Sequence, residues 1–185
     1  MLKIKSILFS IFAAAILLVV IDSASADNPP DQPVFVQEYL KQLDFIEGRL
    51  LQLEGAMAQD QMSWSPAEDV RSCAQIYLHV AGANYFLASK MGGEMPEGEM
   101  DESIIDKDKI ADMMKESYKV VKKLAAELTE EQLNETVQTP FGEMSLRYFM
   151  TALLNHMHEH LGQGIAYARM KGVTPPWSAE QEGEG

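Results

Sequence analysis

Four stretches of this chain place apolar residues three and four positions apart, which is the spacing of one buried face of an α-helix. They run from about residue 35 to 57, from Ser72 to Lys90, from about 110 to 128 and from Ser145 to Lys171. No stretch shows the sustained alternation of apolar and polar residues that predicts a half-buried strand. The sequence therefore predicts an all-α fold, a four-helix bundle around one hydrophobic core.

Residue types that favour helix ends support these bounds. Ser72 and Gln75 match the S-x-x-Q capping box, in which each side chain bonds to the backbone N–H of the other residue. Gly92 and Gly172 follow the second and fourth helices, where glycine adopts a left-handed conformation without strain. The segment NETVQTPFGEM, residues 134–144, has no helical period and is expected to be irregular.

The N-terminal residues have the three parts of a secretory signal peptide. Lys3 and Lys5 precede an apolar run of about fifteen residues, and Ala24-Ser-Ala26 provides a cleavage site. The apolar run is short for a membrane span, which needs about 20 residues. We expect cleavage after Ala26, a periplasmic or secreted location and no stable membrane insertion afterwards. Retention of the segment as an anchor is the alternative.

The rest of the chain forms one domain with short extensions. Proline-rich residues 27–33 should form an extended leader, since proline disfavours a helix interior. Residues 34–177 contain the helical bundle, and this length is sufficient for one core. The acidic tail at 178–185, SAEQEGEG, has almost nothing to bury and is expected to be disordered.

Charge and cysteine content restrict the partners and cross-links of this chain. The formal net charge of −13 at pH 7 argues against a nucleic-acid partner, because phosphate backbones bind basic surfaces. Cys73 is the only cysteine, so an internal disulfide is excluded. It could act as a redox thiol or form an intermolecular bridge. A free cysteine is more often a small buried hydrophobe.

Three of the four histidines lie in the stretch LLNHMHEHLGQG, residues 153–164. At 100° per residue, His156 and His160 lie one turn apart on the inner face of the fourth helix, and His158 lies on the opposite face. Two imidazoles four residues apart can reach a single cation. The zincin motif HExxH is absent because position 157 is methionine, so its glutamate base is missing.

His79 provides a third candidate ligand from the second helix. It shares an inward stripe with small and apolar residues that would let another helix approach. With His156 and His160 it would form a three-histidine site with an open fourth position, as in catalytic zinc sites. The alternatives are hydrogen-bonded core histidines and a surface pair that senses pH.

Three further residues are candidates for the pocket or for the shell behind the ligands. Gln163 follows His160 by about one helical turn and could bond to a substrate or orient a ligand. Tyr167 and Trp64 could form pocket walls, although packing in the core is the commoner role of such aromatic residues.

The stretch HMHEHLGQGIAYARMKGVTPPWS, residues 156–178, resembles the last helix of the DinB-like superfamily, whose pattern is close to H-x-x-E-H-x-G-Q. The stretch SWSPAEDVRSCAQIYLHVAGANYF, residues 63–86, is similar to the second helix of that family. The resemblance implies a four-helix bundle with up-down-down-up topology and metal ligands at His79, His156 and His160. It also implies a divalent metal, zinc or nickel first, with iron and manganese as further candidates. Characterised relatives include thiol-dependent transferases and isomerases.

These features predict an exported, metal-dependent transferase or hydrolase that acts on a small molecule which the sequence does not name. A non-catalytic periplasmic module that binds metal or another ligand is the alternative, and a homodimer is compatible with both. Met91, Met95 and Met100 could instead form an exposed copper site, because thioether ligands suit Cu(I).

Overall fold

The computed structural model describes residues 32–96 and 100–183, and these are mainly helical. The predicted signal peptide and residues 27–31 of the leader lie outside the described residues. The long helices are α1 (Val34–Ala56), α2 (Cys73–Lys90), α3 (Lys107–Ala126) and α5 (Leu146–Met170). The short elements are the helices η1 (Gln59–Gln61), α4 (Glu130–Leu133) and α6 (Pro176–Gly183) and the strands β1 (Thr136–Thr139) and β2 (Gly142–Ser145).

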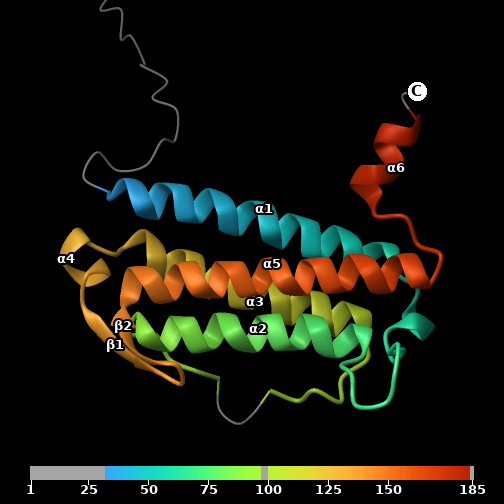
Figure 1. The fold of residues 1–185 in the computed structure, drawn as a ribbon, viewed down its shortest axis with the longest axis horizontal. Helices are drawn as coiled ribbons and strands as arrows, with labels where there is room; N and C mark the ends of the chain where they lie inside the picture. The colour runs from blue at the N-terminus through green and yellow to red at the C-terminus, as the bar shows by residue number, and fades with distance from the viewer. Residues whose placement is uncertain (1–31, 97–99, 184–185) are drawn as a thin grey trace, which may run out of the picture.

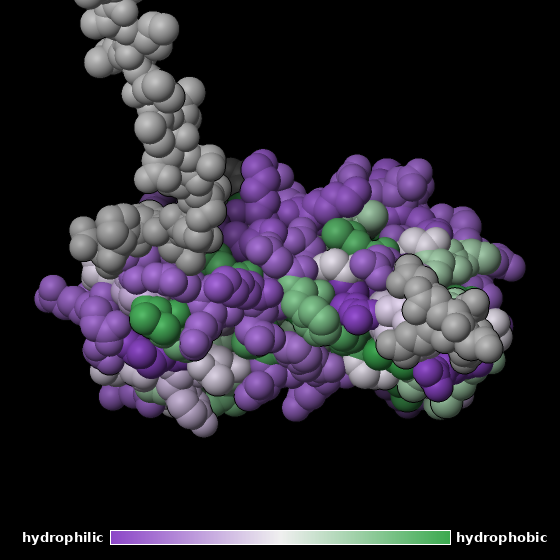
Figure 2. Space-filling model, turned by 90° about the horizontal axis from the view of Figure 1, so that it is seen from above, coloured by the Kyte–Doolittle hydropathy of each residue, from purple (hydrophilic) through white to green (hydrophobic). Residues whose placement is uncertain are grey.

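The four long helices run side by side (Figure 1). α1 contacts α3 and α5, and α2 contacts the same two helices. Their inward side chains form one core, which includes Leu43, Ile46, Leu50, Leu78, Met114, Val121, Phe149 and Met157. The face seen in Figure 2 is mainly hydrophilic, with apolar side chains in small separate patches. Of the helices described, none is long and apolar enough to cross a membrane.

The predicted capping residues lie at the starts of the two helices that carry the clustered histidines. The Ser72 hydroxyl accepts from Gln75 N–H at 3.2 Å, and the Gln75 side-chain oxygen accepts from Ser72 N–H at 2.9 Å. The Ser145 hydroxyl accepts from Tyr148 N–H at 3.2 Å at the start of α5. Gly172, with a φ of 75°, follows the end of α5. The predicted bounds of α2 and α5 are therefore confirmed.

Residues 134–144, expected to be irregular, contain most of a two-stranded antiparallel hairpin. Thr136 pairs with Ser145 at its open end. Gly142 begins β2 with a φ of 104°, a conformation that favours glycine. Each strand has four residues, which is at the lower limit at which alternation of apolar and polar residues can be recognised. The all-α prediction is corrected to a mainly helical fold with one small sheet.

Helix α6 includes most of the tail that was expected to be disordered. Pro176 starts it, where the fixed φ of proline favours a first helical residue. Trp177 lies against α1, with its ring centroid 4.3 Å from the guanidinium carbon of Arg49. Residues 178–183, for which the sequence predicted disorder, belong to α6, and residues 184 and 185 lie outside the described part of the chain.

Cys73 is the first residue of α2, and 1% of its surface is exposed. Its backbone N–H donates to the carbonyl oxygen of Trp64 at 2.9 Å. Burial raises the pKa of its thiol and so disfavours the reactive thiolate. Cys73 is therefore the small buried hydrophobe that the sequence favoured.

A buried polar contact joins α2 to α3. The Asn84 side-chain amide donates to the Ser117 hydroxyl at 3.0 Å, and that hydroxyl donates to the Met114 carbonyl oxygen at 2.7 Å. Asn84 and Ser117 have no measurable exposure. Because a buried amide without partners is unfavourable, this contact restricts how α2 can rotate or slide along α3.

We expect Ser117→Ala to lower the free energy of unfolding by about 1–3 kcal/mol, because it leaves the buried Asn84 amide without a partner. Urea unfolding followed by circular dichroism measures the change. Ser63→Ala, at an exposed position, is the control and should change stability by less than about 0.5 kcal/mol. Equal effects of the two substitutions would contradict the role of the contact.

Candidate metal centre

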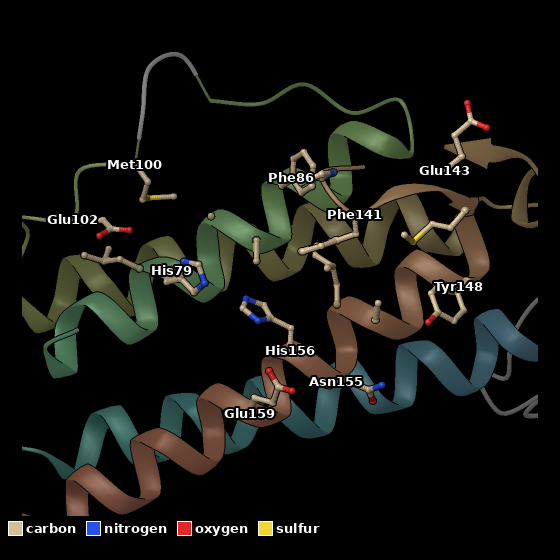
Figure 3. A pocket seen from close by; sticks show the side chains of 17 residues that line it. His79, Phe86, Met100, Glu102, Phe141, Glu143, Tyr148, Asn155, His156 and Glu159 are labelled. Atoms are coloured by element: carbon tan, nitrogen blue, oxygen red, sulfur yellow. The ribbon is translucent and has the colours of Figure 1, made fainter. Parts of the chain in front are cut away.

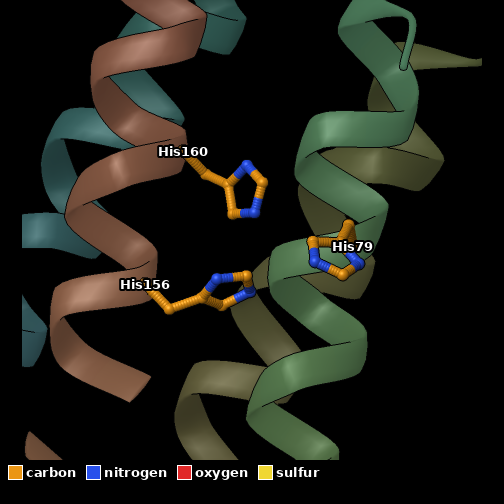
Figure 4. Close-up of side chains that lie close together, drawn as sticks. All are labelled: His79, His156 and His160. Atoms are coloured by element: carbon orange, nitrogen blue, oxygen red, sulfur yellow. The ribbon is translucent and has the colours of Figure 1, made fainter. Parts of the chain in front are cut away.

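Three half-buried histidines from two helices face one another between α2 and α5 (Figure 4). His79 comes from α2, and its ring centroid lies 5.0 Å from that of His156 and 4.8 Å from that of His160 on α5. The centroids of His156 and His160 lie 4.4 Å apart. His158 is exposed, and its Nδ1 lies 2.9 Å from the Leu154 carbonyl oxygen. The structure thus brings together the three histidines that the sequence singled out and separates the fourth from them.

The nitrogen atoms of this triad fit a transition-metal ion. One ligand nitrogen from each of His79, His156 and His160 lies within 4.8 Å of the other two. Zinc at about 2.0–2.1 Å from each nitrogen would hold them about 3.3 Å apart, so small side-chain rotations would close the site. Three imidazoles suit zinc, nickel, copper or iron better than magnesium or calcium, which prefer oxygen ligands.

A hydrogen-bonded chain behind His160 orients its ring. The Gln163 side-chain amide donates from Nε2 to the Tyr167 hydroxyl at 3.0 Å, which leaves Gln163 Oε1 to accept from His160 Nδ1–H at 2.9 Å. His160 therefore carries its proton on Nδ1 and presents the lone pair of Nε2 to an ion. The ring of Trp64 meets that of Tyr167 edge to face at 5.5 Å. Tyr167 therefore positions Gln163, and Trp64 packs against Tyr167. Neither aromatic residue lines the large cavity described below.

The surroundings of the triad keep its imidazoles neutral. Burial, with the nearby positive charge of Arg71, lowers the pKa of His79 from 6.5 to about 4. Burial also lowers the pKa values of His156 and His160, although the bond to Gln163 partly offsets the shift at His160. No carboxylate of the described residues lies within ion-pairing distance of Arg71. At neutral pH the three ligand lone pairs are therefore free of protons.

A cavity of about 920 Å³ adjoins the triad (Figure 3). His79 and His156 form part of its wall, and the remainder comes from α2, α5, the hairpin and the segment before α3. Sequence reasoning missed the contribution of Phe141 and Tyr148 to this wall. The hairpin that positions Phe141 was expected to be irregular, so nothing in the sequence connected that residue to the site.

The three methionines considered as copper ligands have different surroundings. Met91 packs against the core, Met95 is half exposed, and Met100 lines the large cavity. A shared thioether site would need all three to face one point, and these surroundings do not favour it.

Comparison with known proteins identifies the family. The model of the DinB superfamily matches residues 42–163, which is well over half of the chain. The chain belongs to the DinB superfamily. The predicted membership of the DinB-like superfamily is therefore confirmed. No curated protein matches this DinB-superfamily chain.

Two solved structures resemble that of this DinB-superfamily protein. A DinB-like protein from Bacillus cereus ATCC 10987 has a TM-score of 0.65 and 22% sequence identity, over 75% of this chain and 93% of that chain. A DinB-like protein from Bacillus subtilis has a TM-score of 0.61 and 19% identity, over 74% of this chain and 94% of that chain. At these identities the similarity shows a common fold.

The stability of the metal-free DinB-superfamily protein should depend on pH below 6.5. The unfolded chain binds protons at its histidines as the pH falls below 6.5, whereas folded His79 resists protonation down to about 4. The stability that the folded protein gains from neutral His79 is therefore fully present above pH 6.5 and is lost progressively as the pH falls towards 4. Urea unfolding of chelator-treated protein across this range measures it. His79→Asn should make the free energy of unfolding depend less steeply on pH, and His158→Asn should not. The same pH dependence in both variants would refute the assignment of this effect to His79.

Gln163→Leu should weaken metal binding about 10- to 100-fold, because His160 loses the acceptor that fixes its proton and its orientation. Competition with a chromogenic chelator measures the affinity. Gln163→Glu keeps an acceptor for His160 and should retain most of the affinity. Gln52→Leu, at an exposed position of α1, is the matched control. Unchanged affinity in Gln163→Leu would show that the bond to His160 does not tune the site.

Proposed function

We propose that this protein binds a divalent metal ion through His79, His156 and His160 and acts as a metal-dependent transferase or hydrolase on a small organic molecule. The observation that carries the proposal is the convergence of three neutral imidazoles from two helices at the wall of a large cavity. A three-histidine site leaves a coordination position open, which is typical of catalytic rather than structural metal sites. Zinc and nickel are the first candidates, followed by iron and manganese.

In this proposal the three histidines hold the metal ion, and the residues that line the cavity hold the substrate. The ion would supply Lewis-acid chemistry, which lowers the pKa of a water or thiol ligand. His160 is held in the ligating tautomer by Gln163, and Tyr167 fixes the Gln163 amide in turn. The cavity receives the organic part of the substrate.

The remaining parts of the proposal concern topology and location. We infer an up-down-down-up bundle from the contacts of α1 and α2 with the same two helices and from family membership. The basic start, apolar run and Ala24-Ser-Ala26 site of residues 1–26 support export and cleavage. The acidic net charge of −13 supports a small-molecule partner over nucleic acid.

Metal analysis of the chelator-free protein tests the site. The full chain should bind about one equivalent of zinc or nickel, as three protein ligands define a single centre. His79→Ala and His156→Ala should each lose it, and His158→Ala is the matched control that should retain it. Metal retained after both triad substitutions would refute the assignment.

The catalytic part is tested separately. The metal-loaded protein should turn over a member of a panel of thiol-acceptor and ester substrates, and His79→Ala should abolish that activity. A fully metallated protein that is inactive on the whole panel would instead favour a non-catalytic module that binds metal or another ligand.

A further inference from the structure

The cavity beside the triad has walls suited to an apolar molecule. Its volume of about 920 Å³ is at the upper end of the range for small-molecule sites, which runs from about 300 to 1,000 Å³. The aromatic walls are Phe86 from α2, Phe141 from the hairpin and Tyr148 from α5 (Figure 3). Phe86 is held by an edge-to-face contact with the buried Phe149, with ring centroids 5.7 Å apart. Figure 3 shows Phe86 and Phe141 between α2 and α5 and Tyr148 beside the start of α5.

Two of these aromatic walls are open to water. Phe141 is 79% exposed and Tyr148 is 64% exposed. Exposed apolar side chains that gather at a cavity mark a binding site, because a ligand that covers them removes apolar area from water. The occupant should therefore reach from the triad, where His79 and His156 form one part of the wall, to the tip of the hairpin.

The charged residues of the cavity are all acidic. Glu102, Glu143 and Glu159 line it, and no lysine or arginine does so among the described residues. Arg71 lines a smaller cavity, which shares Glu102 with this one. Lys90 contacts the Phe86 ring, 5.0 Å from its centroid, but is not part of the cavity wall.

These acidic residues should distinguish ligands that have the same shape but differ in charge. Glu143 accepts from the neutral Gln138 amide and has no cationic partner among the described residues. Carboxylates next to aromatic faces attract an ammonium group and repel a carboxylate. The arrangement therefore favours a cation over an anion.

We propose that this cavity binds an apolar amine, with its apolar body between α2 and α5 and its ammonium group at one of the glutamates that line it, Glu102, Glu143 or Glu159, which lie on different parts of the wall (Figure 3). As a substrate class the proposal rests on the metal-dependent function proposed above, since the triad forms one part of the cavity wall. The proposal that the cavity is a binding site for amines depends only on the residues that line the cavity. The two can therefore be tested apart.

Octylamine, octanol and octanoate share one apolar body and differ in charge. Their affinities are measured by displacement of the neutral fluorescent probe N-phenylnaphthylamine from the full chain, both zinc-loaded and after chelation. In the chelated protein, octylamine should bind about tenfold more tightly than octanoate at low ionic strength, and the ratio should fall as salt is added. Octanoate binding as tightly as octylamine, or no displacement by any of the three, would overturn the proposal.

Gly82 offers a variant that blocks the cavity without disturbing the helix. It lines the cavity, and a Cβ built there meets no atom within 4 Å. Gly82→Leu should abolish binding of the probe and of octylamine. Gly162→Leu is the matched control, since Gly162 lies on α5, is exposed, has equal room for a Cβ and does not line the cavity. Undiminished binding of octylamine by Gly82→Leu would show that octylamine does not bind in this cavity and would overturn the proposal.

The carboxylates are tested together. The triple substitution of glutamine for Glu102, Glu143 and Glu159 should make octylamine and octanoate bind equally well in the chelated protein. The same substitution at three exposed glutamates elsewhere changes the net charge equally and should keep the preference; these are Glu38, Glu127 and Glu131. Loss of the preference in both triple variants would show that overall charge, and not the cavity, selects the amine.

Failure of this proposal differs from failure of the metal site. Metal bound through the triad without a preference for octylamine would refute the amine site and leave the metal function intact. Octylamine binding that depends on Gly82, in a protein whose metal does not depend on His79, would refute the metal function and leave the amine site intact.

Discussion

The packing of α2 against α3 and α5 at the same time determines both the core and the candidate metal centre. On one side, the buried Asn84 amide bonds to Ser117 of α3. On the other, His79 faces His156 and His160 of α5. Rotation of α2 about its axis would break the first contact and withdraw His79 from the second. The position of His79, the third candidate ligand, therefore depends on a polar contact that lies outside the candidate metal centre.

Burial gives the triad its chemistry. Partly withdrawn from water and close to the positive charge of Arg71, the three imidazoles remain neutral at a pH where exposed histidines begin to bind protons. A divalent ion would supply the positive charge in place of protons and would use the lone pairs that burial keeps free. The hydrogen bonds from His160 to Gln163 and from Gln163 to Tyr167 also orient one imidazole, because they leave Nε2 of His160 as the nitrogen that could face an ion.

Selectivity for an organic ligand arises from different elements. The DinB fold provides the two helices that flank the cavity, while the hairpin before α5 adds Phe141 to the wall. The structural relatives share 22% and 19% of their residues with this chain, which supports a common fold. Individual side chains decide which ligand a fold binds, and in the amine site that we propose this role falls to the three glutamates and the aromatic walls.

The sequence by itself determined what depends on neighbours within one helix. The spacing of apolar residues predicted the long helices, and the capping residues Ser72 and Ser145 predicted two of their starts. The angle of 100° per residue separated His158 from His156 and His160 before any contact was known. These properties are local, because a helix fixes the relative directions of side chains a few residues apart.

Only the tertiary structure decided which distant residues meet. The approach of His79 to α5, the effect of Arg71 on the imidazoles and the wall formed by Phe141 all depend on packing between elements. The sequence misjudged the hairpin because four-residue strands are too short to show a clear alternation of apolar and polar residues. The contact of Trp177 with Arg49 likewise joins elements that lie far apart in the sequence. Local spacing constrains angles within a helix, but distances between helices are set by how their side chains pack together.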